Sequence, residues 1–279
     1  MTFGMWTGYI GLLAAVLLTG HALFWAMMAL SLGRDRDPAE VRSMLGIVGR
    51  SRWPHVVVPW AWRLPFASLG FVFLLLVAIA TLGASGITPA IGALLLAVAA
   101  CNVLLALRPS PPAAYADLGL TLALVSALAL PPGSGAGFDL YATARLGHVL
   151  AAALWLGHMF VWSLFGGPAL KRVQPTATAE FLRERSLYLG GLGWPALVVL
   201  GITGIPLLMA HGIGIADLLT GAAFAGPGGG ALAVKLALVL AMVVYQAVFA
   251  HRPTQMVHLN MAAALAVLAL AVVLSGGGI

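Results

Sequence analysis

The sequence predicts an all-α integral membrane protein of eight transmembrane helices, arranged as two parallel four-helix repeats with both termini outside. Three observations support this fold class: the composition, the spacing of long uncharged segments and an internal duplication. Of the 279 residues, 62% are hydrophobic and 8% are charged, whereas about 25% are charged in an ordinary soluble domain. This composition excludes a soluble globular protein.

Eight predominantly apolar segments are long enough to cross a bilayer, because about 20 residues at about 1.5 Å each span a hydrocarbon core of about 30 Å. In chain order they are 6–32, 58–83, 87–107, 114–131, 143–168, 188–210, 230–250 and 257–275. No basic residue precedes the first segment, so we expect it to stay in the membrane rather than to be cleaved as a signal peptide. Pro59 and Pro65 interrupt the start of the second segment.

Basic loops follow every odd-numbered segment and predict the orientation. Apart from Arg145 and Lys235, the 14 basic residues all lie in these loops, at Arg34, Arg36, Arg42, Arg50, Arg52, Arg63, Arg108, Lys171, Arg172, Arg183, Arg185 and Arg252. The positive-inside rule makes this face cytoplasmic. We therefore expect a multi-pass protein of the bacterial inner membrane with both termini in the periplasm. The loops also account for the net charge of +6, so we expect no nucleic acid partner.

Three colinear sequence matches indicate an internal duplication. The matched pairs are GHALFW (20–25) with GHMFVW (157–162), WPHVVVPWAWRLP (53–65) with WPALVVLGITGIP (194–206), and NVLLALRP (102–109) with QAVFAHRP (246–253). We therefore expect a first repeat over 1–135 and a second over 136–279. Each contains an even number of spans, so the repeats run parallel, and His21 and His158 are expected at equivalent depths.

Ionisable residues inside a span predict a functional site, and the seven histidines separate by depth. Two lie near the middle of a span, two near the outer end of a span and three near the cytoplasmic face: His21 and His158, His148 and His211, and His55, His251 and His258, respectively. Neutral imidazole is the usual axial ligand of b-type haem and also binds copper. A haem held by two histidines needs them at similar depth on different helices, which predicts His21 with His158, or His148 with His211.

The fifth segment carries an aromatic and imidazole stripe. His148, Trp155 and His158 share one helix face. Arg145 lies one turn before His148, and Lys235 enters the seventh segment from the same outer side. Two cations beside an outer-leaflet histidine could bind the propionates of a haem. The same two residues are equally consistent with end residues that snorkel to the interface.

Copper is the alternative cofactor, because methionine sulfur and imidazole both bind it. Met209 lies beside His211 at the outer face, and further methionines lie near the inner histidines. The candidate metal ligands are His148, His158, Met209, His211, His251 and His258. Methionine is also an ordinary apolar filler of helix bundles, so this spacing permits a copper site without requiring one.

Other chemistries lack their sequence signatures. A single cysteine, Cys101, excludes a disulfide framework and a paired-thiol motif. There is no P-loop, no Rossmann glycine motif, no His-Glu-x-x-His and no nucleophile elbow. Only two carboxylates, Asp117 and Asp217, come near a span, which argues against a carboxylate-based proton or sodium transporter.

The second repeat contains an ordered set of residues: His148, Trp155-Leu-Gly157, Trp194-Pro195, Thr203-Gly204, Lys235-Leu and His251-Arg252. This set resembles the CopD copper-resistance membrane family and, more distantly, the HemJ-type protoporphyrinogen oxidases. The resemblance implies a four-helix unit linked to copper passage or tolerance, or to b-haem with His148 in the ligand position. The Pro-Arg pair of the HemJ pattern is absent. The first repeat has Gly11, Ile91 and Leu107 where the second has His148, Lys235 and His251, so any cofactor is expected in the second repeat.

Three functions remain open at this stage. One is a b-type cytochrome-like subunit that passes electrons between the membrane and a periplasmic or membrane redox partner. Another is a copper-handling protein of the CopD type that serves a cuproenzyme. The last is a structural accessory subunit of a larger membrane complex, with histidines that only join helices. In each case we expect contact with membrane lipids. We also expect an electron-transfer or metal-handling subunit rather than a stand-alone enzyme.

Overall fold

The computed structural model describes residues 3–33, 64–82, 88–108, 110–130, 139–161, 175–226, 228–249 and 257–274. Within these residues every regular element is a helix, which confirms the all-α prediction for the described part. The long helices are α1 (Phe3–Gly33), α3 (Leu64–Leu82), α4 (Pro89–Leu107), α5 (Pro111–Ala129), α6 (Leu140–Val161), α8 (Pro175–Ala210), α10 (Gly229–Phe249) and α11 (Val257–Leu274). Two short helices, α9 (Ile215–Thr220) and η3 (Ala222–Phe224), join α8 to α10.

Four of the described helices contain a stretch that is long and apolar enough to cross a membrane. These stretches are Gly4–Met27, Pro111–Ala129, Leu140–Val161 and Gly193–Ala210. Shorter apolar stretches occupy α3, α4, α10 and α11. Many large apolar side chains on the outer surface are exposed, among them Phe73, Leu96 and Leu240. An extended apolar surface of this kind marks contact with a membrane.

Helix starts differ from the expected segments where a cap decides them. α5 begins at Pro111 rather than at 114. Ser110 Oγ accepts a hydrogen bond of 3.4 Å from the backbone N–H of Ala113, and proline is favoured in the first turn after such a cap. Thr88 caps α4 in the same way, immediately before Pro89.

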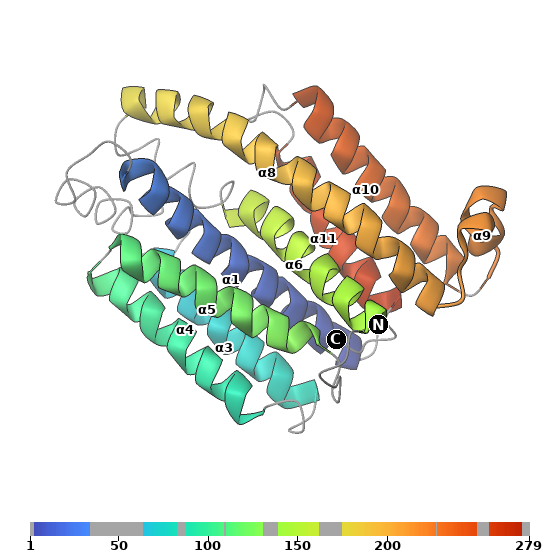
Figure 1. Cartoon of the computed structure of the whole chain (residues 1–279), viewed down its shortest axis with the longest axis horizontal. Coiled ribbons are helices and arrows are strands. Elements are labelled where there is room, and N and C mark those ends of the chain that lie inside the picture. Colours follow the sequence, from blue (N-terminus) through green and yellow to red (C-terminus); the bar gives the residue numbers. More distant parts are fainter. Residues whose placement is uncertain are drawn as a thin grey trace.

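The sixth expected segment is part of a longer helix. α8 begins at Pro175 rather than at 188 and contains Pro195 and Pro206. Figure 1 shows α8 as a long bent helix, as expected where proline removes a backbone hydrogen bond inside a helix. The expected residues 58–63 and 162–168 lie outside the described residues.

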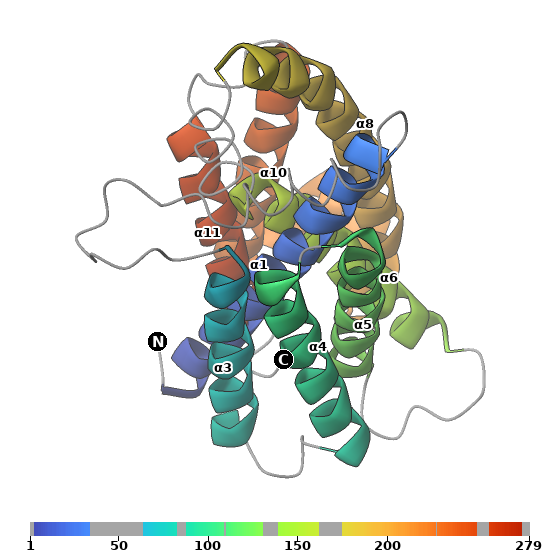
Figure 2. The same ribbon diagram turned by 90° about the vertical axis from the view of Figure 1, so that its left-hand side faces the viewer.

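α1 lies at the centre of the bundle. It packs against α3 and α5 on one side and against α6 on the other, and it also touches α11 (Figure 1). Figure 2 shows α3, α4 and α5 next to one another. α1 and α6 both run from lower right to upper left in Figure 1, so the two helices are parallel. α11 ends at the same end of the bundle where α1 begins.

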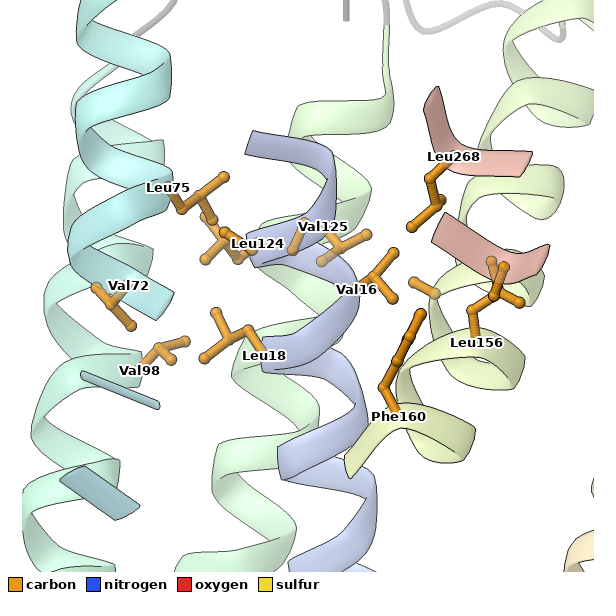
Figure 3. Close-up of a cluster of buried hydrophobic side chains, with 14 of the residues drawn as sticks. Val16, Leu18, Val72, Leu75, Val98, Leu124, Val125, Leu156, Phe160 and Leu268 are labelled. Atoms are coloured by element: carbon orange, nitrogen blue, oxygen red, sulfur yellow. The ribbon is translucent and has the colours of Figure 1, made fainter. Parts of the chain in front are cut away.

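The hydrophobic core follows α1 along its length. Figure 3 shows Val16 and Leu18 of α1 between side chains of α3, α4 and α5 on one side and of α6 and α11 on the other. The side chains labelled around them are Val72, Leu75, Val98, Leu124, Val125, Leu156, Phe160 and Leu268. The core therefore ties the N-terminal helices to the C-terminal ones.

A glycine pair sets the distance between α1 and α6. A Cβ atom built on Gly20 would lie 1.9 Å from the carbonyl oxygen of Gly157, and one on Gly157 would lie 2.1 Å from the carbonyl oxygen of Val16. The two backbones are therefore in direct contact, as small residues permit in membrane helix pairs. Gly20 and Gly157 begin the two copies of the repeated Gly-His motif, so His21 and His158 lie at the same level of the bundle.

The two halves differ in how closely their helices pack. α3 packs on α1 much as α8 packs on α6, and the pair α4 and α5 resembles the pair α10 and α11. In the first half α5 lies along α1 with extensive contact, whereas in the second half α11 touches α6 at few described positions. The helices of the two halves are also joined by different polar side chains.

Candidate functional site

A buried polar network joins the four long helices of the first half. It contains five side chains that are each at most 1% exposed: His21 and Trp25 of α1, Ser68 of α3, Asn102 of α4 and Asp117 of α5. Polar groups inside an apolar bundle are costly unless they are hydrogen-bonded. The network therefore holds these helices in one relative register.

Trp25 determines which nitrogen of His21 carries a hydrogen. The indole Nε1–H of Trp25 donates to His21 Nε2 over 3.0 Å. An indole nitrogen only donates, so Nε2 is the unprotonated nitrogen and the neutral ring carries its hydrogen on Nδ1. That atom lies 3.9 Å from Oδ2 of Asp117, which is close enough for electrostatic interaction and too long for a direct hydrogen bond.

Asn102 connects the rest of the network. Its amide nitrogen donates to Asp117 Oδ1 over 2.9 Å and to the carbonyl oxygen of Val98 over 2.9 Å. Its amide oxygen accepts a hydrogen bond from the hydroxyl of Ser68. Asp117 lies inside α5 (Pro111–Ala129) and is buried there. Its place within the expected span 114–131 agrees with this position.

Ser68→Ala is expected to destabilise the protein by about 1 kcal/mol, because it leaves the buried amide oxygen of Asn102 without its donor. Ser126→Ala is the matched control, since Ser126 Oγ donates only to the carbonyl of Leu122 in its own helix, over 2.7 Å. We expect the control to be close to neutral. Thermal unfolding of the purified variants in detergent measures both. Equal melting temperatures for the two variants would contradict a hydrogen bond between α3 and α4.

His158 lies next to the glycine contact, on the opposite helix from His21. It is 8% exposed and belongs to the buried part of α6. The structure brings His21 and His158 to one level, as the duplication predicts. In this conformation Nε2 of His21 accepts from Trp25 and Nδ1 faces Asp117, so His21 does not offer an open nitrogen for sharing a metal with His158.

His148 is held differently, by α8. Its Nδ1 lies 3.1 Å from Thr203 Oγ1, and that hydroxyl donates to the carbonyl of Val199 over 2.6 Å. The Thr203 oxygen therefore accepts, and His148 carries its hydrogen on Nδ1. This tautomer leaves the lone pair on Nε2, which is therefore the nitrogen available to bind a metal.

One of two glycines beside the His148 ring, Gly147, lets α6 approach α8 closely. A Cβ atom on Gly147 would lie 3.1 Å from Cγ2 of Thr203, and one on Gly204 would lie 3.7 Å from Cε1 of His148. The Thr203-Gly204 pair of the recognised pattern thus forms the surface on which His148 rests. The first of these glycine positions is the tighter one, because 3.1 Å is shorter than an ordinary carbon contact.

Lys235 comes from α10 and interacts electrostatically with the His148 ring. It is half-buried, as are Arg145 and Trp155 of α6. Trp155 packs against the hydrophobic core. His148 and Thr203 are therefore in direct contact. Lys235 of α10 lies within electrostatic range of the His148 ring, and Arg145 lies one turn away along α6.

His211 and Met209 lie apart from this group. Both are exposed at the end of α8, and His211 Nδ1 lies 2.8 Å from the carbonyl oxygen of Leu207. His211 follows Thr203 by eight residues, which is about 12 Å along a helix. His148 and His211 are therefore at different depths, and the structure does not bring them together as a ligand pair. His251 lies outside the described residues, as does the side chain of His258.

Within the part of the chain that the structure describes, no group of three or more histidine, cysteine or carboxylate side chains could hold a metal ion. A metal bound at His148 would therefore take fewer than three such ligands from the described residues. Comparisons with protein-family models, with curated proteins and with solved structures gave no match. The chemistry of the site rests on its geometry alone.

Proposed function

We propose that the chain is an inner-membrane electron-transfer subunit that crosses the bilayer eight times as two parallel four-helix repeats, and that its second repeat binds haem b through His148. The observation that carries the proposal is the His148 ring, with Nδ1–H bound to Thr203 over 3.1 Å and its other nitrogen left as a ligand. The parallel course of α1 and α6 supports the repeat arrangement. The apolar outer surface supports membrane insertion.

The donor set suits haem b. A neutral imidazole whose Nδ1–H binds an oxygen acceptor is oriented and made more basic as an iron ligand. Lys235 interacts electrostatically with His148, which is where the negative propionates of a haem need a cation. Arg145 lies one turn from His148 on α6, on the same face of the helix. These residues are the ones that would hold the group.

The roles of the chain follow from these contacts. Bound haem supplies one-electron chemistry at low dielectric. Thr203 fixes the tautomer of His148, and Gly147 lets α6 and α8 approach each other closely beside the ring. Lys235 offsets negative charge that would otherwise be costly at membrane depth. The electron donor or acceptor is a periplasmic or membrane redox partner, consistent with a subunit of a larger membrane complex.

Copper handling of the CopD type is the second candidate, because the Nε2 lone pair of His148 is also a copper ligand. Exposed Met209 and His211 at the end of α8 would then offer copper its first contact at the surface. The two proposals differ in the group that remains on the protein after purification.

A visible spectrum of the purified protein, dithionite-reduced minus oxidised, with iron and copper analysis on the same sample, tests the proposal. We expect a sharp α-band and stoichiometric iron. Bound copper without the band would instead establish copper handling. Neither metal, after supplementation of the growth medium with haem precursor and copper, would contradict both and favour a structural subunit.

A further inference from the structure

Asp117 is a fully buried acid, and two side-chain oxygens at this point of α5 lack a hydrogen-bond partner among the described residues. It is 0% exposed, and its Oδ2 accepts no hydrogen bond from a described residue. One turn further along α5, Thr121 Oγ1 is also 0% exposed and has no hydrogen-bond partner among the described residues. Side chains four residues apart share a helix face. Two such oxygens in an apolar bundle require a further hydrogen-bonding atom between them.

The ionised form of Asp117 would need a positively charged group beside it. An ionised carboxylate at membrane depth needs a compensating positive charge. The nearest titratable groups on the helices packed around it are His21 on α1, Cys101 on α4, whose thiol interacts electrostatically with Asp117, and His158 on α6, at the level of His21. The other titratable groups of α1 and α6 lie ten or more residues, about 15 Å or more, along their helices from these histidines; they are Tyr9, Tyr141, Arg145 and His148. A thiol provides no positive charge, and Asp117 makes its ion-pair contact with His21.

Trp25 prevents His21 from supplying the positive charge. A doubly protonated His21 would place its Nε2–H against the indole N–H that now donates to Nε2 over 3.0 Å. Two donors facing each other are repulsive, so the ring stays neutral with its hydrogen on Nδ1. The charge on the carboxylate is then removed only by a proton on Asp117 itself.

We propose that Asp117 is a proton-binding site in the first four-helix half, with His21 and Thr121 as positioning residues. The bond that forms is Oδ2–H, with a proton taken up from water, and its hydrogen is directed to a water that bridges Asp117 to Thr121 Oγ1 or to His21, because neither oxygen has a direct partner among the described residues. The separation of 3.9 Å from His21 Nδ1 suits such a bridging water. The site shares no residue with the haem site at His148, so it stands independently of that function.

Infrared spectroscopy of the purified full chain in lipid nanodiscs tests the proposal. At neutral pH we expect the carbonyl stretch of a protonated carboxylic acid, which is lost in Asp117→Asn and retained in Asp217→Asn. Asp217 is the matched control because its Oδ2 accepts the backbone N–H of Gly214 over 2.7 Å at the start of a short surface helix. Absence of the stretch in wild-type protein, or its persistence in Asp117→Asn, would overturn the proposal. If the stretch were lost when sodium ions replace potassium ions in the buffer, Asp117 would instead be a sodium-binding residue.

Trp25→Phe provides a second test that does not alter the carboxylate. Removal of the indole N–H lets His21 Nε2 take a proton, so His21 and Asp117 then form a charged pair. We expect the carboxylic acid stretch to weaken at neutral pH and a carboxylate stretch to replace it. An unchanged stretch in correctly folded Trp25→Phe, judged by its thermal unfolding, would show that His21 does not position this proton.

Discussion

Gly20→Ala is expected to destabilise the protein by about 3 kcal/mol or more and to lower the yield of folded protein sharply. The added Cβ atom would lie 1.9 Å from the carbonyl oxygen of Gly157 and 2.1 Å from its carbonyl carbon. These neighbours are backbone atoms of α6, which cannot rotate away as a side chain does. The two helices must separate, and overpacking of this kind typically costs about 1–3 kcal/mol, and more where the structure cannot adjust.

Gly157→Ala should act in the same way, because its Cβ atom would lie 2.1 Å from the carbonyl oxygen of Val16. Gly119→Ala is the matched control. Gly119 lies inside α5 with nothing within 4 Å of an added Cβ atom, so alanine there should be neutral or stabilise by up to about 1 kcal/mol. Thermal unfolding in detergent and the monodisperse fraction on gel filtration measure all three. Similar behaviour of Gly20→Ala and Gly119→Ala would rule out the close contact of α1 and α6.

The glycine contact also shows how far the sequence alone leads. Apolar runs are separated by charged, proline or glycine residues, so hydropathy predicted most described ends of the eight long helices to within a few residues. Among the described residues, Ser110 and Pro111 start α5 earlier and α8 extends back to Pro175, whereas the expected residues 58–63 and 162–168 lie outside them. The repeated Gly-His motif marked the depth of His21 and His158. It did not reveal that the two glycines touch, because contact between helices depends on their rotation and crossing point.

The polar contacts between helices were the harder part to predict. Asp117 lies 15 residues along the chain from its partner Asn102, and Asn102 lies 34 residues from its own partner Ser68. A hydroxyl or amide inside an expected span signals such a network, but it does not name the partner. His148 with Thr203 was the reverse case. Both residues belong to the ordered set whose family resemblance stays a prediction. Only the structure shows that they meet, with Thr203 eight residues before His211.

His148→Ala is expected to abolish the reduced-haem absorption band, because it removes the half-buried histidine whose ring is held by α8 with Nε2 available. His211→Ala is the control, since His211 is exposed and bonds to its own helix over 2.8 Å. It should leave the band unchanged. The spectra are compared at equal protein concentration, with thermal unfolding as a check that both variants fold. A normal band in His148→Ala would remove His148 from the ligand set, and loss of the band in both would place the haem elsewhere.

Thr203→Val separates ligation from orientation. Valine has nearly the same shape but no oxygen to accept from His148 Nδ1–H, which lies 3.1 Å away. The imidazole then becomes less basic and less fixed, so we expect haem affinity to fall about 10- to 100-fold and the reduction potential to rise. Thr203→Ser keeps the acceptor and should restore both values. A purely structural role of Thr203 would lower stability in the valine variant without moving the potential, because packing alone does not change the electron donation of the ligand.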